Sequence, residues 1–374
     1  MPFLLFLTAL ALAEDAQPAA DAPPEVAPPE VAPEVPLDPA APAPPPVDAT
    51  SSFGQLLSMF HEGFDLSAYG DVVFTVNADT LNFTSTHFNP IIGAALHEDV
   101  YAEGEIEFED GGTDVRLEYA YVDWTPSEFV SVRTGQFLVP IGDFNDQGHP
   151  SFRWDMVTRP SMGRSVIPAV WTDTGLQVMG AVESDNVRFD YAAYVINGLG
   201  ARPGEDSVDG KFDATAVDPL LPLSANFDDN NRDKGLGGRA RLSVHPGPAH
   251  LEVSASAYTG AASSDGGDRL TLVDVAWDFD VRTFGLRGEA AQSFDDGDPL
   301  ERGMYAEVWG RIHKVTPAAR VDVVRPLRNA AAETSLAASL MVAPRTYWTV
   351  RAEGQVSVVG EPRPTLSLMS AFFF

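Results

Sequence analysis

Five stretches in which apolar and charged residues alternate contain an arginine, one intervening residue and then a carboxylate. The intervening residue is always apolar or small. Side chains two residues apart on an extended strand share a face, so each pair would project from one side of a strand. Such a face either braces itself through ion pairs or presents alternating charges to polar solutes. The pairs are Arg116/Glu118, Arg188/Asp190, Arg287/Glu289, Arg320/Asp322 and Arg351/Glu353.

Further charged residues alternate with apolar ones in the same way, namely Glu103, Glu105, Glu107, Arg133, Arg239, Arg241, Glu252, Glu307 and Arg311. With the five pairs they make ten carboxylates and nine arginines. The charged face is therefore close to neutral, although the whole chain has a formal net charge of −30. Most of the excess acid must lie in the N-terminal segment and the loops.

No residue pattern in the sequence favours catalysis. The seven histidines are scattered, and there is neither a His-Glu-x-x-His nor a Gly-x-Ser-x-Gly motif. The chain has no cysteine, which excludes thiolate metal sites, disulfides and cysteine nucleophiles. A strongly acidic chain with three lysines is a poor nucleic-acid binder. We predict neither an enzyme nor a nucleic-acid partner.

The charged positions fall in short alternating segments, which run from Leu66 to the C-terminus. Segments near ten residues match the length of a tilted strand across a bilayer. A charge that faces lipid at mid-bilayer costs roughly 2–4 kcal/mol for Arg or Lys, so the charged faces must line the interior of a closed barrel. We therefore predict an all-β fold, a transmembrane antiparallel β-barrel of about sixteen strands within 66–374. The strands are expected at about 67–77, 83–94, 99–109, 114–123, 130–139, 174–183, 187–197, 236–245, 250–258, 269–279, 281–292, 302–312, 318–325, 334–343, 346–357 and 364–374.

The links between the predicted strands favour a barrel. Short turns at one mouth and longer loops at the other are characteristic of outer-membrane barrels. Along the chain every second link is short, and the links between the short ones include two long ones, 140–173 and 198–235. This alternation puts both ends of the barrel on the periplasmic side. The short links are 95–98, 124–129, 184–186, 246–249, 280, 313–317 and 344–345.

The C-terminal segment places Phe372 and Phe374 on one face of a strand. This ending resembles the last strand of bacterial outer-membrane barrels. The resemblance implies that both residues form an insertion signal for the barrel-assembly machinery. On the outer face we expect aromatic belts at the depth of the lipid headgroups, where Trp and Tyr are favoured. The candidates are Tyr119, Tyr121, Phe189, Tyr191, Trp277, Phe279, Trp348, Phe372 and Phe374.

Three other kinds of sequence precede the barrel. Residues 1–13 have the apolar core and small-residue end of a secretory signal peptide. Residues 14–48 are rich in Pro and Glu, a composition that cannot bury enough surface to fold and that favours an extended spacer. Residues 49–65 are expected to hold one short amphipathic helix. The spacer would lie in the periplasm, either as a plain linker or as a tether that touches the cell wall.

Several stretches resemble the phosphate-selective porin family, the O and P porins. They are Arg133–Asn145, Pro168–Gly180, Tyr191–Gly198 and Glu105–Glu109, so the resemblance covers roughly 99–198. It implies a sixteen-stranded, trimeric diffusion channel. It does not carry phosphate selectivity over, because anions need fixed positive charge at a narrow point and this chain has few lysines and a balanced wall.

The two long links are the candidates for solute selection and ion binding. A loop as long as 140–173 is usually functional. Either it folds inward and forms a constriction, or it packs outside against neighbouring protomers or lipopolysaccharide. The link 198–235 carries eight acids, and carboxylates suit Ca²⁺, but it has no EF-hand spacing and we prefer a solvated acidic loop. We predict no other cofactor or metal. The constriction candidates are Asp143, Asp146, Arg153, Arg159 and Arg164.

These features predict a porin of the bacterial outer membrane, a passive diffusion channel for small hydrophilic solutes or ions. Its expected partners are the lipid bilayer, lipopolysaccharide, the barrel-assembly machinery and two further copies of the chain. A rival interpretation is a structural barrel that anchors the envelope to the cell wall through its Pro-rich spacer. A barrel with hydrolase activity is a third alternative, and no motif supports it.

Overall fold

The computed structural model describes residues 63–201, 224–225, 231–325, 332–359 and 362–374. All of them belong to one unit, Ala49–Phe374. The predicted signal peptide, the spacer and nearly all of the segment 49–65 lie outside the described residues, and residues 64–65 of that segment belong to the first strand rather than to a helix. Among the described residues no helix is long and apolar enough to cross a membrane.

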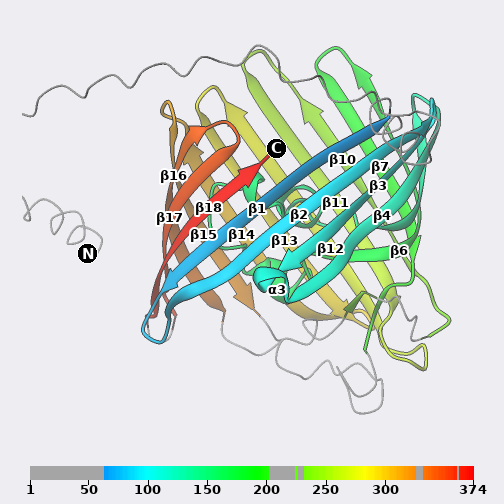
Figure 1. Ribbon diagram of the computed structural model, residues 1–374. Coiled ribbons are helices and arrows are strands. Elements are labelled where there is room, and N and C mark those ends of the chain that lie inside the picture. The colour runs from blue at the N-terminus through cyan, green and yellow to red at the C-terminus, as the bar shows by residue number, and fades with distance from the viewer. Residues whose placement is uncertain (1–62, 202–223, 226–230, 326–331, 360–361) are drawn as a thin grey trace, which may run out of the picture. The chain divides into compact units, whose positions relative to one another are not determined.

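The described residues form a closed antiparallel barrel (Figure 1). Each barrel strand pairs with the next barrel strand in the chain. Strand β7 therefore pairs with β10, and β1 pairs with β18 to close the barrel. The prediction of a sixteen-stranded all-β barrel is confirmed. Two short strands, β8 (Leu199–Gly200) and β9 (Ser224–Ala225), pair separately. The barrel strands are β1 (Phe64–Val76), β2 (Leu81–His97), β3 (Val100–Glu109), β4 (Asp114–Ser127), β5 (Val130–Leu138), β6 (Thr172–Ser184), β7 (Val187–Ile196), β10 (Gly235–Val244), β11 (Ala249–Ala261), β12 (Arg269–Val281), β13 (Phe284–Asp295), β14 (Asp298–Gly310), β15 (Val315–Arg325), β16 (Glu333–Arg345), β17 (Trp348–Ser357) and β18 (Pro364–Phe373).

The two faces of the strands have opposite character. Along β12, Val273 and Val275 are exposed, whereas Asp274 between them is buried. Along β17, Val350 is exposed, whereas Arg351 is buried. On these strands apolar side chains therefore face outward and charged side chains face inward, which is the arrangement that a bilayer requires.

Several turns differ from their predicted positions, including the β12–β13 and β13–β14 turns. Strand β12 continues to Val281 and β13 begins at Phe284, so the turn consists of residues 282–283 and not of residue 280. Strands β13 and β14 are joined by residues 296–297, although the predicted strands left 293–301 between them. Arg282, Asp296 and Gly297 have positive φ angles of 55°, 49° and 88°. Such residues form tight two-residue hairpin turns, so a link at the long-loop mouth is short here.

A bulge between β3 and β4 changes the face of two tyrosines. The pairing of β4 with β3 passes from Tyr119 to Leu117, so Glu118 is an extra residue without a partner. Beyond a bulge the alternation of faces shifts by one residue. Tyr119 is therefore buried, and Tyr121 donates a hydrogen bond to Glu103 Oε1 at 2.7 Å. The prediction that these two tyrosines belong to an outer aromatic belt is wrong.

The link between β5 and β6, residues 139–171, is named here the inner link. It contains a π-helical turn (Phe144–Gly148), a 3₁₀ turn (Ser151–Arg153) and the helix α3 (Met162–Ser165). Its two ends are held together because Val139 N–H donates to the Trp171 carbonyl at 3.0 Å. It supplies much of the buried apolar cluster, which also includes the wall residues Tyr258, Leu270, Tyr305 and Trp309. The buried members from the inner link are Val139, Ile141, Phe144, Trp154, Met156, Met162, Val166, Ile167 and Trp171.

Candidate functional site

The inner link is joined to the barrel wall by ion pairs. Three of its carboxylates each meet an arginine that projects inward from β10 or β13. The Asp143–Arg241 and Asp155–Arg287 contacts measure 2.7 and 2.9 Å, and Asp146 pairs with Arg239. These partners are 93 or more residues apart in the sequence. The arginines are therefore occupied by the link and are not left facing an open passage.

Backbone groups of the inner link make a second set of contacts with wall charges. Wall carboxylates accept hydrogen bonds from amides, and wall arginines donate hydrogen bonds to carbonyl oxygens. Hydrogen bonds to charged groups are roughly twice as strong as neutral ones, so these contacts fix the path of the link. The amide contacts are Phe144 to Glu289 (3.2 Å), Val157 to Glu353 (2.6 Å) and Ser161 to Asp322 (2.9 Å), and the arginine contacts are Arg320 to Thr158 O (2.8 Å) and Arg351 to Ser151 O (2.5 Å).

The structure divides most of the sequence-predicted wall residues into two groups. The first group contacts the inner link or lies buried beside it: Arg239, Arg241, Arg287, Glu289, Glu307, Arg320, Asp322, Arg351 and Glu353. The second group lies on β3, β4 and β5: Glu103, Glu105, Glu107, Arg116, Glu118 and Arg133. In this group Glu118 is the residue that meets the link, with its Oε1 3.2 Å from His149 Nε2.

Three predicted wall residues lie near the strand ends. Arg188 pairs with Asp190 at 2.7 Å close to the β6–β7 turn, and its side chain is half-exposed. Arg311 lies one residue beyond the end of β14, with its guanidinium carbon 4.2 Å from the centroid of the Trp309 ring. Strand β14 ends at Gly310, and the exposed Arg311 side chain lies 3.7 Å from Asp280, so its place in the pore wall stays a prediction.

The predicted constriction residues have different surroundings. The carboxylates of Asp143 and Asp146 face the β10 arginines. Arg153 and Arg159 are exposed, with the Arg153 guanidinium 5.9 Å from the ring of Phe152. Arg164 lies in α3, and its side chain is outside the described part of the structure.

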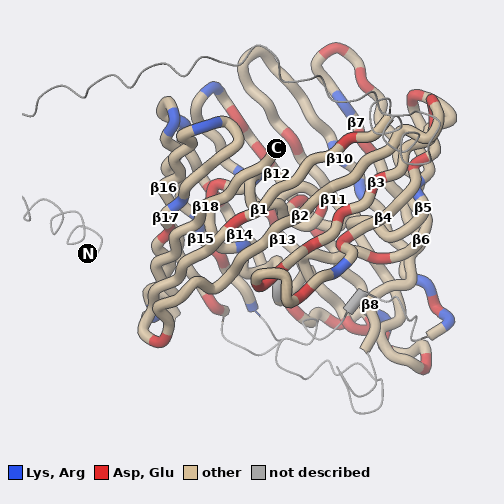
Figure 2. Tube along the Cα trace, viewed as in Figure 1, with Lys and Arg blue, Asp and Glu red and all other residues tan. Residues whose placement is uncertain are grey.

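A cavity of about 790 Å³ lies between the inner link and part of the barrel wall. That part consists of β1, β2, β3 and β4 and, on the other side of β1, of β18, β17, β16 and β15. This acidic cavity is lined by both polar and apolar residues, and charged positions occur along the barrel strands as well as in the turns (Figure 2). None of the five wall arginines bound to the link lines it. Its charged and titratable lining residues are Asp71, His87, Glu107, Glu109, Glu118, His149, Arg159 and Glu333.

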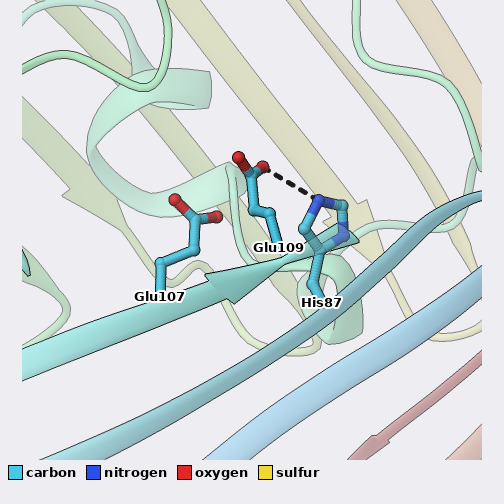
Figure 3. A group of neighbouring side chains, drawn as sticks. All are labelled: His87, Glu107 and Glu109. Carbon is cyan, nitrogen blue, oxygen red and sulfur yellow. Dashed lines mark hydrogen bonds and ion pairs between the residues drawn. The ribbon is translucent and has the colours of Figure 1, made fainter. Parts of the chain in front are cut away.

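Sequence reasoning missed Asp71, His87 and Glu109 as wall residues. His87 Nδ1 lies 3.0 Å from Asp71 Oδ1, and His87 Nε2 lies 3.1 Å from Glu109 Oε1 (Figure 3). The signal that could have found His87 and Glu109 is the continuation of the polar alternation at residues 85, 87 and 89 of β2 and at residues 105, 107 and 109 of β3.

The Ca²⁺ prediction for the acidic link lies largely outside the described residues. Of its eight acids only Asp233 is described, and it pairs with Arg269 at 3.0 Å. At the C-terminus, the backbone of Phe374 exchanges two hydrogen bonds with Ala68, and Phe372 and Phe374 are exposed. Their role as an insertion signal stays a prediction.

No family model matches the chain. An uncharacterised protein of Aquifex aeolicus (strain VF5) is 28% identical over 220 residues, which are 56% of this chain and 47% of that protein. The chain thus spans about half the length of the curated relative that it matches. Membership of the phosphate-selective porin family stays a prediction.

Several solved structures have the same fold. A loop-deletion mutant of OmpT, an outer-membrane protein of Vibrio cholerae, has a TM-score of 0.57 at 11% identity, covering 83% of this chain and 99% of that chain. A trimer form of OmpT has a TM-score of 0.53 at 10% identity, with coverages of 83% and 99%. An anion-selective porin from Comamonas acidovorans has a TM-score of 0.55 at 9% identity, with the same coverages. These likenesses show a porin-type outer-membrane barrel fold.

Proposed function

We propose that this chain is a porin of the bacterial outer membrane, a passive and non-catalytic channel for small hydrophilic solutes that prefers cations. The observation that carries this proposal is the acidic cavity beside the inner link. Its lining holds five carboxylates and one arginine. Fixed negative charge at a narrow point raises the local concentration of cations and lowers that of anions.

The division of charge between the link and the open passage supports cation preference. Counted over the whole wall, arginines and carboxylates nearly balance, but the wall arginines on β10, β13, β15 and β17 all donate to the inner link. A guanidinium that already donates to a carboxylate or carbonyl offers little to a passing anion. Phosphate selectivity is therefore not part of this proposal.

The first prediction concerns ion selectivity. In a planar bilayer under a KCl gradient, the purified protein is expected to give steady ohmic steps and a reversal potential of the sign for K⁺ over Cl⁻. The variant Glu107→Gln/Glu109→Gln should shift that potential towards zero, because it removes two charges from the cavity. Glu183→Gln is the matched control, since Glu183 is exposed at the end of β6 and does not line the cavity.

The outcomes of this experiment are distinct. A potential of the opposite sign would refute cation preference, and block by low phosphate concentrations would support the selectivity of the phosphate-selective family instead. Absence of steps from folded protein would contradict the channel itself. The rival function, an envelope anchor, would then remain. Deletion of residues 14–48 would impair that function.

The porin function also implies a location, an oligomeric state and partners for the chain. We infer that the chain resides in the outer membrane with the spacer in the periplasm, that it forms a homotrimer, and that lipopolysaccharide and the barrel-assembly machinery are its partners. The trimer form of a solved protein with this fold supports the oligomeric state. A cell-wall contact through the spacer belongs to the rival function.

The second prediction tests the lipid-facing surface. Val275 lies at the middle of β12 and is exposed on the apolar face. Val275→Arg should lower the free energy of unfolding in lipid vesicles by about 2–4 kcal/mol, because an arginine is poorly solvated at mid-bilayer. Phe284→Arg, at the first residue of β13, should cost about 0–1 kcal/mol because it lies near the interface. Equal costs in a urea titration would contradict this placement of the bilayer.

A further inference from the structure

One imidazole and two carboxylates meet on the wall of the acidic cavity. His87 projects from β2, and Glu107 and Glu109 project from β3, which pairs with β2 so that His87 lies opposite Glu109. One ligand atom from each residue lies within 4.8 Å of the other two. Figure 3 shows the three side chains on the same side of the two strands, with His87 facing Glu109.

We propose that His87, Glu107 and Glu109 form a binding site for a divalent transition-metal ion, within the wall of the passage. A set of one imidazole and two carboxylates is a donor set that Zn²⁺ accepts, and imidazole disfavours Mg²⁺ and Ca²⁺ relative to Zn²⁺. The cluster borders the cavity, which gives a hydrated ion a route to it and space for water in the remaining positions.

A fourth residue orients the histidine as a metal ligand. Asp71 lies 3.0 Å from His87 Nδ1 and is 3% exposed. A carboxylate at Nδ1 holds the proton on that nitrogen and leaves the Nε2 lone pair for a metal, which is the usual carboxylate–histidine–metal arrangement. Nε2 is the nitrogen that faces Glu109, at 3.1 Å.

A buried amide next to the cluster supplies an independent observation. Asn89 is the next inward residue on β2 after His87, lines the same cavity and is 1% exposed. Its Nδ2 donates to Glu105 and Glu118, at 2.7 and 3.2 Å. Its Oδ1 has no hydrogen-bond partner among the described residues. This buried oxygen is available to accept a hydrogen bond from a water in the cavity.

Arg116 is the charge that a metal would have to replace. Its guanidinium lies 2.5 Å from Glu109 and 3.7 Å from Glu107, and its side chain is half-exposed. It also contacts Asp114, on its own strand, at 2.5 Å. Arg116 can therefore release the two glutamates while keeping a partner, so the exchange of an arginine for a dication leaves no buried charge unpaired.

The test uses the full-length protein in detergent, with ZnCl₂ as the probe in isothermal titration calorimetry. We expect one Zn²⁺ per chain, and His87→Gln or Glu109→Gln should weaken binding by at least about tenfold, since even neighbours of metal ligands change affinity by that factor. Glu333→Gln, which alters the same cavity elsewhere, and His313→Gln, which removes a histidine in a turn, should bind Zn²⁺ like the parent.

The result that overturns the site is equal Zn²⁺ affinity in the parent and His87→Gln, or no binding by the parent. Circular dichroism and intact-barrel mobility on gels show whether each variant has folded, and Glu107→Gln gives a second ligand variant if His87→Gln has not. Binding in detergent needs no conduction. Zn²⁺ binding by a protein that gives no channel steps would therefore keep the site and refute only the proposed function.

Discussion

Replacement of residues 140–170 by a two-residue Asn-Gly turn is expected to raise the single-channel conductance several-fold. The inner link fills the barrel with buried apolar side chains, so its removal opens the lumen to water. The geometry permits the change, because Val139 N–H already bonds the Trp171 carbonyl at 3.0 Å and Leu138 pairs with Thr172. A two-residue turn closes such a hairpin.

The same variant should show weaker cation preference. Without the inner link, Arg239, Arg241 and Arg287 lose the aspartates that they contact. Their guanidinium groups would become part of the wetted wall and attract anions. Reversal potentials in a KCl gradient should therefore move towards zero or change sign, together with the rise in conductance.

The matched control shortens a different link at the same mouth. Residues 262–268 join β11 to β12, and Ala262 N–H bonds the Asp268 carbonyl at 3.0 Å, so an Asn-Gly turn in place of residues 263–267 fits there too. This control should conduct like the parent. If the variant without the inner link folds and yet conducts like the control, the inner link is not what limits the passage.

Arg320→Met is expected to lower the free energy of unfolding by about 3–5 kcal/mol, the usual cost of breaking a buried ion pair. The Arg320 side chain is 0% exposed and contacts Asp322 at 2.7 Å and Glu307 at 3.9 Å. It also donates to the Thr158 carbonyl at 2.8 Å. Its loss leaves Asp322 buried without a cation, and Arg287 as the remaining partner of Glu307.

Two variants separate this mechanism from a general loss of packing. Arg188→Met removes an exposed arginine that pairs with Asp190, and should cost about 0–1 kcal/mol. Arg320→Met/Asp322→Met removes both buried charges and should recover much of the loss, because no isolated charge remains. Urea unfolding in detergent measures all three. A double variant less stable than Arg320→Met would show that the loss comes from packing.

The sequence by itself determined the barrel. A bilayer tolerates no unpaired backbone groups and few charges on the lipid-facing surface of a protein. The alternation with period two, the segment lengths and the turn residues were therefore sufficient to predict the strands. The errors lie where one residue changes the pattern. Positive φ at Arg282 moved a turn by two residues, and the extra residue Glu118 reversed the faces of Tyr119 and Tyr121. A single bulge leaves no trace in composition or periodicity.

The tertiary structure decided which of the wall charges contact the inner link. The sequence predicted a nearly neutral wall, and it left open whether the link at 140–173 folds inward. Asp155 meets Arg287 across 132 residues, and the Ser161 amide meets Asp322 across 161. Contacts at such separations depend on how the closed barrel brings its walls together. For the same reason His87 and Glu109, 22 residues apart, became neighbours only through the register of β2 and β3.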